Sequence, residues 1–149
     1  MGLFRSFDIS ASGMTAQQFR ADIIAENIAN VNTTRTTNAG TPYRRKIVNF
    51  QEKQLNTFDR YLTESRRRGS HIGNGVKVNA VGEDTQTDFI MDYDPSHPDA
   101  DENGYVSYPN VNIVTEMTDL IDASRAYEAN TTAFDASKAM AQAGLQVGK

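Results

Sequence analysis

Cysteine is absent from this chain of 149 residues. Without cysteine the chain cannot form a disulfide, a thiolate nucleophile or a zinc–thiolate site. Every contact that holds the chain to itself or to another molecule is therefore non-covalent.

Long hydrophobic runs are also missing. No segment approaches the roughly 20 apolar residues of a membrane-spanning helix, so we expect no direct membrane insertion. The first ten residues contain both Arg5 and Asp8, and no apolar run typical of a secretory signal peptide follows them. We therefore expect no cleavable signal peptide.

Side chains that carry enzyme chemistry are scarce. The two histidines, His71 and His97, fall in separate predicted loops. No serine or threonine has a nucleophile-elbow context, and the glycines near His71 do not have nucleotide-binding spacing. The sequence thus predicts no catalytic residue, no cofactor and no metal site, and we do not expect an enzyme.

One acidic loop raises the alternative of a cation-dependent module. Residues 83–102 hold eight carboxylates and no Lys or Arg. Asp99, Asp101 and Asn103 copy the first half of a calcium-binding loop. Asn110, however, stands where such a loop needs its bidentate glutamate. A turn that leads into the C-terminal segment is the simpler interpretation.

Charge is divided unevenly along the chain. Residues 1–82 hold twelve Lys/Arg and six Asp/Glu, a net of +6, whereas residues 83–149 hold three and thirteen, a net of −10. Such asymmetry favours head-to-tail assembly with a defined orientation. Nucleic acid is not an expected partner, because the isoelectric point is about 5.1.

Helical periodicity dominates residues 109–149. Apolar and small side chains recur there at alternating steps of four and three, which places them on one stripe of a long helix. Pro109 and Asn110 offer a stop and a capping side chain at its start. The stripe comprises Ile113, Met117, Leu120, Ser124, Tyr127, Thr131 and Phe134, and a second row comprises Ala126, Ala129, Ala133, Ala136, Met140 and Ala143. Two such rows predict a helix with partners on two sides.

A second helix is predicted over residues 10–31. Its apolar side chains again recur at steps of three and four, and it should end where Asn27, Asn30 and Asn32 crowd together, since asparagine favours turns over helix interiors. The amides of Asn27 and Asn30 could also bond to a neighbouring backbone.

These patterns predict a mainly α fold with a small β insertion. We expect residues 1–35 and 109–149 to form a coiled-coil-like helical domain, and residues 36–108 to form a β-containing middle segment with the acidic loop. Short strands are predicted over residues 42–53, 75–81 and 89–93. Only 38% of the residues are hydrophobic, and long helices with polar positions on their stripe are marginal alone. We therefore expect the fold to be completed by assembly.

Several motifs carry a family resemblance. They are Ser10-Ala-Ser-Gly-Met-Thr-Ala16, Ala25-Glu-Asn-Ile-Ala-Asn-Val-Asn-Thr33, Pro42-Tyr-Arg-Arg-Lys46, His97-Pro-Asp-Ala-Asp101, Pro109-Asn-Val-Asn112 and Arg125-Ala-Tyr-Glu-Ala-Asn130. Their order and spacing resemble those of bacterial flagellar axial proteins, and the C-terminal half is most similar to proximal-rod proteins of the FlgC type. Residues 53–75 match nothing in this family, so no role is assigned to them.

The resemblance implies a structural subunit of the proximal rod, the drive shaft of the bacterial flagellar basal body. It implies as partners other flagellar rod proteins, copies of the same chain, and export-gate or basal-body components. It also implies a place in the periplasm-spanning rod after type III export without cleavage. A non-polymerising coiled-coil adaptor remains the alternative, because it would share the same helical stripes.

The residues expected to form the subunit interface lie on the two predicted helices. They are Phe19, Ile23, Asn27, Ile28, Asn30, Met117, Leu120, Ile121, Tyr127, Asn130, Phe134, Met140 and Leu145.

Overall fold

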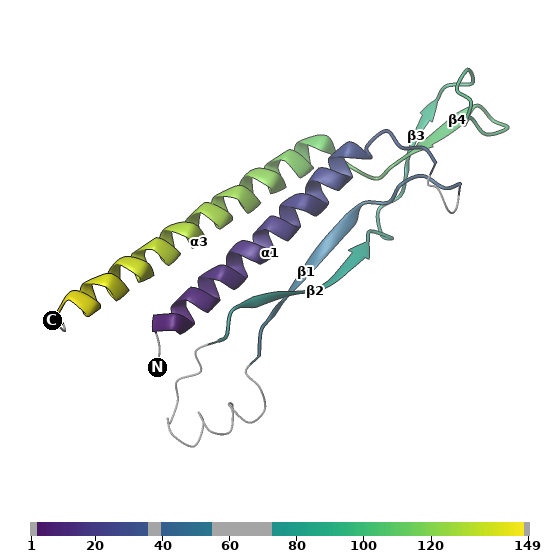
Figure 1. Ribbon diagram of the computed structural model, residues 1–149. Helices are drawn as coiled ribbons and strands as arrows, with labels where there is room; N and C mark the ends of the chain where they lie inside the picture. The colour runs from purple at the N-terminus through teal and green to yellow at the C-terminus, as the bar shows by residue number, and fades with distance from the viewer. Residues whose placement is uncertain (1–2, 36–39, 55–72, 148–149) are drawn as a thin grey trace. The chain divides into compact units, whose positions relative to one another are not determined.

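The computed structural model describes residues 3–35, 40–54 and 73–147 (Figure 1). In chain order its elements are α1 (Leu3–Ala29), β1 (Lys46–Glu52), β2 (Val76–Glu83), β3 (Ile90–Tyr93), β4 (Tyr105–Tyr108) and α3 (Ile113–Val147). The predicted class, mainly α with a small β insertion, is confirmed. Most of residues 53–75 and His71 lie outside the described residues.

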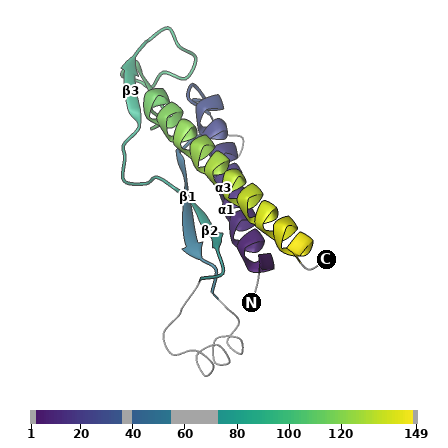
Figure 2. The ribbon, with the colours of Figure 1, turned by 90° about the vertical axis from the view of Figure 1, so that its left-hand side faces the viewer.

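The chain divides into two compact units, and each unit contains part of both helices. Unit 1 comprises Met1–Phe19, Phe50–Asn79 and Ser124–Lys149, and unit 2 comprises Arg20–Asn49 and Ala80–Ala123. Within each unit, α1 lies beside α3, as both ribbon views show (Figures 1 and 2). Each unit therefore joins segments from both ends of the sequence.

Helix α1 begins at Leu3, before the predicted start at residue 10, and ends at Ala29. Its end is a turn built from asparagine, as predicted. The Thr33 amide donates to the Asn30 carbonyl (3.0 Å), and the Thr33 hydroxyl donates to Asn30 Oδ1 (3.1 Å). The first bond pairs a backbone carbonyl just past the helix end, and the second holds the turn together through side chains.

Helix α3 begins at Ile113, and its cap differs from the prediction. The Asn112 Oδ1 atom accepts from the amides of Val114 (3.0 Å) and Thr115 (3.4 Å), so Asn112 is the N-cap residue. The predicted cap, Asn110, is wrong. Its side chain is buried and instead bonds to the backbone of Arg45, Asp84 and Thr87. Tertiary bonds decide between these two asparagines.

The strands form two separate pairs. In the β1–β2 pair, the Lys53 amide donates to the Gly75 carbonyl (2.8 Å) and the Asp84 amide to the Arg45 carbonyl (2.8 Å), which makes the pair antiparallel. In the second pair, Ile90 lies opposite Tyr108 and Tyr93 opposite Tyr105. Strand β4 was not predicted, because its four residues lie between an acidic turn and a proline.

Unit 1 is held by contacts between the first part of α1 and the second part of α3. The rings of Phe7 and Phe134 pack with centroids 4.9 Å apart. Gly13 brings α1 close to the Asn130 side chain, because a Cβ added at Gly13 would lie 2.6 Å from Asn130 Oδ1. Gly13 thus allows close helix packing, although glycine costs about 1 kcal/mol against alanine in a helix.

We expect Gly13→Ala to destabilise the otherwise wild-type chain and to stabilise a chain that already carries Asn130→Ala. In the wild-type background the new methyl group overlaps the Asn130 side chain, so the free energy of unfolding should fall. In an Asn130→Ala background the overlap is gone, and Gly13→Ala should raise it by about 1 kcal/mol. Urea unfolding of the wild type, the two single variants and the double variant measures these changes. An equal effect of Gly13→Ala in both backgrounds would contradict the contact between Gly13 and Asn130.

Candidate assembly surface

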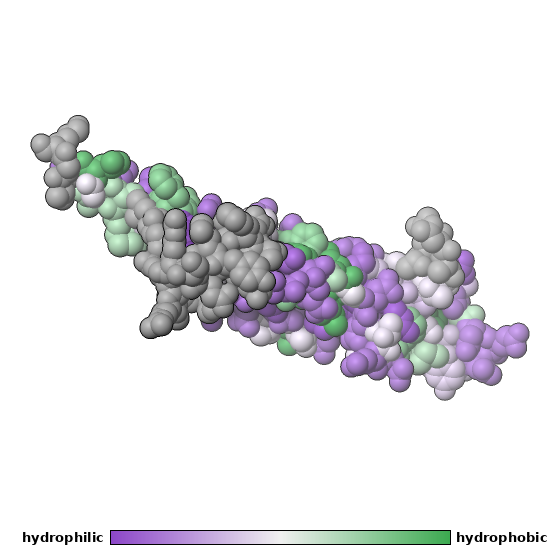
Figure 3. All heavy atoms as spheres, turned by 90° about the horizontal axis from the view of Figure 1, so that it is seen from below, coloured by the Kyte–Doolittle hydropathy of each residue, from purple (hydrophilic) through white to green (hydrophobic). Residues whose placement is uncertain are grey.

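Large apolar side chains are exposed along α3. In unit 2, Val114, Met117 and Ile121 are 74%, 54% and 51% exposed. Steps of three and four place these three residues, hereafter the α3 row, on one face of the helix. Figure 3 shows hydrophobic and hydrophilic residues interspersed over the face that it presents. A helix row of this kind is suited to packing against another helix.

The thirteen predicted interface residues fall into three groups by exposure. The exposed ones are Phe19, Met117, Ile121, Tyr127, Met140 and Leu145. The half-buried ones are Ile23, Ile28, Asn30, Leu120, Asn130 and Phe134, and Asn27 is buried. Those that contact the rest of their own unit include Asn27 in unit 2 and Phe134 in unit 1.

The face that α3 turns toward its own chain is largely small and polar. Its buried residues are Glu116, Ala123 and Ser137. The predicted stripe therefore divides, because Met117 and Tyr127 stay exposed while Leu120 and Phe134 are half-buried. The packing within the chain leaves much of the apolar surface of α3 uncovered.

Asn27 is the centre of a buried polar network in unit 2. Its Nδ2 donates to the Lys46 carbonyl (3.0 Å) and to Glu116 Oε2 (3.0 Å). Its Oδ1 accepts from the Tyr43 hydroxyl (2.8 Å) and the Lys46 amide (2.9 Å). One amide thus ties α1 to α3 and to the start of β1. The expected bond from Asn27 to a neighbouring backbone is confirmed, whereas the Asn30 amide donates within its own helix to the Glu26 carbonyl.

Glu116 extends this network to charged residues. Its side chain is fully buried, and its Oε1 accepts from Arg45 Nε at 2.6 Å. Arg45 also reaches Asp119 (3.4 Å), which pairs with Arg20 at 3.2 Å. A buried carboxylate needs such partners, because burying a charge without them is very costly. The network fixes how the α3 row is presented within unit 2.

Glu116, Arg45, Asp119 and Tyr43 were not predicted as members of this network. Acids such as Glu116 and Asp119 suit the first half of a helix even at its surface, so neither has a local sign of burial. A usable signal was present, because these two acids lie three residues apart, on one side of a helix, and the middle segment supplies Arg45 within a basic triplet.

Tyr43 gives the network a pH dependence. Burial raises the pKa of its hydroxyl above the ordinary value of 10.0, and the nearby carboxylates of Glu26, Glu116 and Glu83 raise it further. The neutral phenol is therefore favoured in the folded state, so its contribution to stability is complete below pH about 10 and is lost as the pH rises beyond it.

We expect the free energy of unfolding to fall above pH about 10, and less steeply in Tyr43→Phe. That variant lacks the hydroxyl and should be about 1 kcal/mol less stable at neutral pH, because the bond to Asn27 is lost. Thermal unfolding between pH 8 and 11 measures both proteins. Parallel curves for the two would contradict the role of Tyr43.

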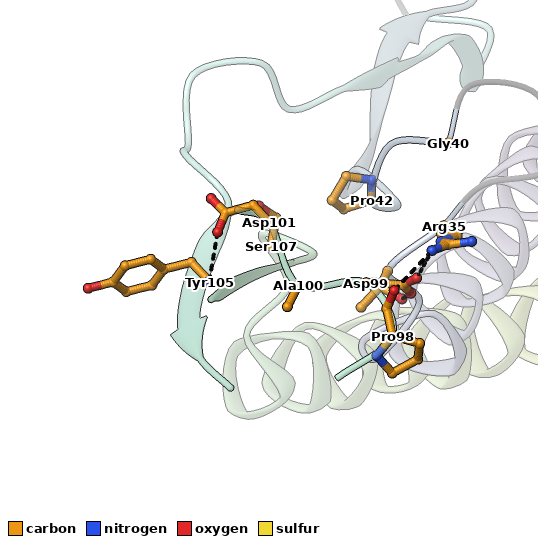
Figure 4. A pocket seen from close by; sticks show the side chains of 10 residues that line it. Arg35, Gly40, Pro42, Pro98, Asp99, Ala100, Asp101, Tyr105 and Ser107 are labelled. Carbon is orange, nitrogen blue, oxygen red and sulfur yellow. Dashed lines mark hydrogen bonds and ion pairs between the residues drawn. The ribbon is translucent and has the colours of Figure 1, made fainter. Parts of the chain in front are cut away.

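The acidic loop uses its carboxylates within unit 2. Asp99 accepts from the Thr34 hydroxyl (2.6 Å) and pairs with Arg35 at the edge of an open cavity of about 430 Å³ (Figure 4). The Thr34 bond and Arg35 hold the pKa of Asp99 below its ordinary value. Asp101 Oδ1 accepts from the amides of Asn103 and Tyr105. These bonds form a turn, which was the simpler of the two interpretations of the acidic loop; the other was a calcium site.

Neither a metal-binding group nor a membrane span is found in residues 3–35, 40–54 and 73–147. No three His, Asp or Glu side chains gather there in a way that could hold a metal ion. No helix in this part is long and apolar enough to cross a membrane. His97 Nδ1 accepts from the Asp99 amide (3.1 Å), so it is part of the turn, as expected.

Comparison with known proteins gives matches at both ends of the chain and across its length. The family model described as "Flagella basal body rod protein" matches residues 7–35, and "Flagellar basal body rod FlgEFG protein C-terminal" matches residues 102–147. These two matches cover most of α1 and all of α3.

Full-length relatives carry the same description. The flagellar basal-body rod protein FlgC of Bacillus subtilis is 43% identical over 152 aligned positions, which cover 100% of both chains. The FlgC of Borreliella burgdorferi is 43% identical over 99% of this chain and 98% of its own. The FlgC of Escherichia coli O6:H1 is 38% identical over 100% of both. On this similarity the chain belongs to the FlgC family of flagellar basal-body rod proteins, which are structural proteins and not enzymes.

Proposed function

We propose that the chain is a structural subunit of the proximal rod and assembles with neighbouring rod subunits through its terminal helices. One observation carries the proposal. A chain with full-length similarity to rod proteins leaves the apolar α3 row uncovered, and in an assembled rod that row would be buried. Burial of apolar area supplies most of the driving force of protein association.

The terminal segments, residues 1–35 and 109–149, would act as the helical axial domain, and residues 36–108 as the middle segment between them. Contacts between unlike surfaces of successive subunits do not close on themselves, so they propagate along an axis. The exposed Phe19, Met117, Ile121, Tyr127, Met140 and Leu145 would contact neighbours directly. The buried Asn27 would support that surface from within.

The partners would be other flagellar rod proteins, copies of this chain, and export-gate or other basal-body components. The subunit would reach the periplasm-spanning rod through the flagellum's own type III apparatus, without cleavage. Rod location is what the family supports, and the absence of an apolar span among the described helices agrees with a subunit that stays outside the bilayer.

We expect Ile121→Asp to abolish swimming. The side chain is 51% exposed in the free chain, so the variant should fold, but assembly would bury an unpaired carboxylate at a cost of several kcal/mol. Swimming in soft agar and the amount of chain in purified basal bodies measure the effect, with circular dichroism as the test of folding.

Thr115→Asp is the matched control, because Thr115 is exposed on α3 but lies off the α3 row. It adds the same charge and should swim normally. Normal swimming and normal rod content in Ile121→Asp would refute the assignment of the α3 row to the interface. Such a result would favour the non-polymerising adaptor.

A further inference from the structure

The β3–β4 hairpin exposes an aromatic face. Residues directly opposite each other in an antiparallel pair share one face, so Met91 with Ser107 and Tyr93 with Tyr105 share a face. Met91, Tyr93 and Tyr105 are 55%, 63% and 44% exposed, whereas Val106 on the other face is fully buried. Figure 4 shows the Tyr105 ring pointing away from Pro42 and Pro98. On the opposite face unit 2 buries Val106 and half-buries Tyr108, while Ile90 and Asp92 stay exposed. The aromatic face is the one with three exposed large side chains.

This hairpin face is ordered before any partner binds. The rings of Tyr93 and Tyr105 meet edge to face, with centroids 5.3 Å apart, and the Ser107 hydroxyl donates to Met91 Sδ (3.1 Å). Gly104 has φ +82°, and a Cβ added there would lie 3.0 Å from the Tyr93 ring. A surface fixed in this way loses little conformational entropy on binding.

A free carboxylate borders the hairpin face. Glu102, three residues before Tyr105 in the turn between β3 and β4, is exposed, and its side chain forms no hydrogen bond or ion pair with any residue of the described part. Asp94 and Asp101, by contrast, are bonded within the turn. An apolar centre with a charged rim is the usual anatomy of a protein interface. The partner surface should accordingly be apolar with a cationic rim.

Unit 1 has a groove that is apolar and bordered by positive charge. It has a volume of about 410 Å³ and is lined by apolar residues and two lysines, including Ala16, Phe19, Val76, Val78, Lys53 and Lys77. Both lysines are exposed, and neither side chain is paired with any residue of the described part. The groove thus combines a hydrophobic floor with two available positive charges.

We propose that the hairpin face of one copy of this chain docks into the groove of a second copy. Tyr93, Tyr105 and Met91 would lie against Phe19, Val76 and Val78, while Glu102 would face Lys53 and Lys77. The contact joins unlike surfaces, so a row of copies keeps one free hairpin at one end and one free groove at the other, and further copies can be added. This inference rests on the proposed rod function and names one of its contacts.

Cross-linking between two variants in assembled basal bodies tests the contact. Full-length Glu102→Cys and Lys77→Cys chains are co-expressed in cells that lack the wild-type copy, and the purified basal bodies are treated with a short bismaleimide. Because the chain has no cysteine of its own, the introduced thiols are the only ones it carries. A covalent dimer that contains both peptides is expected, and none when Lys138→Cys replaces Lys77→Cys.

Two outcomes would overturn the contact. One is rods that contain both variants but give no dimer, and the other is a Glu102→Cys chain linked to a different basal-body protein. Absence of the chain from basal bodies would instead count against the proposed rod function, so the two failures are distinguishable.

Charge reversal gives an independent test. Glu102→Lys or Lys77→Glu should each lower the number of basal bodies per cell, because each places like charges opposite each other in the contact. The two changes together should restore it. Glu102→Lys combined with Lys138→Glu has the same net charge and should not restore it. A Glu102→Lys and Lys77→Glu double variant no better than either single variant would refute the contact.

Discussion

Replacing Glu116 by alanine should lower the free energy of unfolding by about 3 kcal/mol. The carboxylate is fully buried and bonds both Arg45 Nε and Asn27 Nδ2. Its removal leaves the Arg45 guanidinium without its shortest partner and the Asn27 amide with an unpaired donor. Breaking such a pair costs more than the pair is worth, because the Arg45 side chain stays three-quarters buried and keeps only the longer contact to Asp119 (3.4 Å).

Glu128→Ala is the matched control for this change. Glu128 is exposed on the same helix, and its side chain makes no bond in the described part of the chain. Its replacement should change the free energy of unfolding by less than about 0.5 kcal/mol. Urea unfolding followed by circular dichroism compares the two, and a loss below about 1 kcal/mol for Glu116→Ala would contradict the network.

Replacing the three asparagines near the end of α1 should lower the free energy of unfolding by very different amounts. Asn27→Leu removes four hydrogen bonds and leaves the Tyr43 hydroxyl, the Lys46 backbone and Glu116 each lacking a partner. Each such loss costs about 1–3 kcal/mol when the group stays buried, so a total of at least about 3 kcal/mol is expected.

Asn30 and Asn32 supply the graded comparison. Asn30→Ala loses two local bonds, to the Glu26 carbonyl and the Thr33 hydroxyl, at about 1 kcal/mol in total. Asn32→Ala should have an effect below about 0.5 kcal/mol, because Asn32 is exposed. Thermal unfolding of the three variants ranks them. Equal losses at Asn27 and Asn32 would mean that the asparagines act only as turn formers.

The helices and most of the strands could be predicted from the sequence, because both follow from local periodicity. The alternating steps of three and four in residues 113–134 and 16–31 depend only on helix geometry. The position of the α3 cap could not be predicted, since Asn110 and Asn112 are chemically alike. What separates them is that Arg45, Asp84 and Thr87 lie within reach of Asn110 in the folded chain.

The buried network was missed for a related reason. A glutamate in the first turn of a helix is favourable at the surface, and nothing local distinguishes Glu116 from a solvated acid. Its burial depends on Arg45, which lies 71 positions away in the chain. The apolar positions of the candidate surface were identified more readily, because hydrophobic side chains are conspicuous in sequence whether they pack within the chain or between chains.

Cysteine labelling at Ile121 and Leu145 tests the central claim most directly, namely that assembly covers the exposed apolar side chains of the terminal helices. Ile121→Cys, Leu145→Cys and, as a control in the exposed loop after β2, Thr85→Cys are labelled with maleimide in the free chain and in purified basal bodies, and the modified peptides are measured by mass spectrometry. The account predicts that all three label in the free chain and that only Thr85→Cys labels in the rod. Equal labelling of Ile121→Cys and Leu145→Cys in the free and assembled states would contradict it.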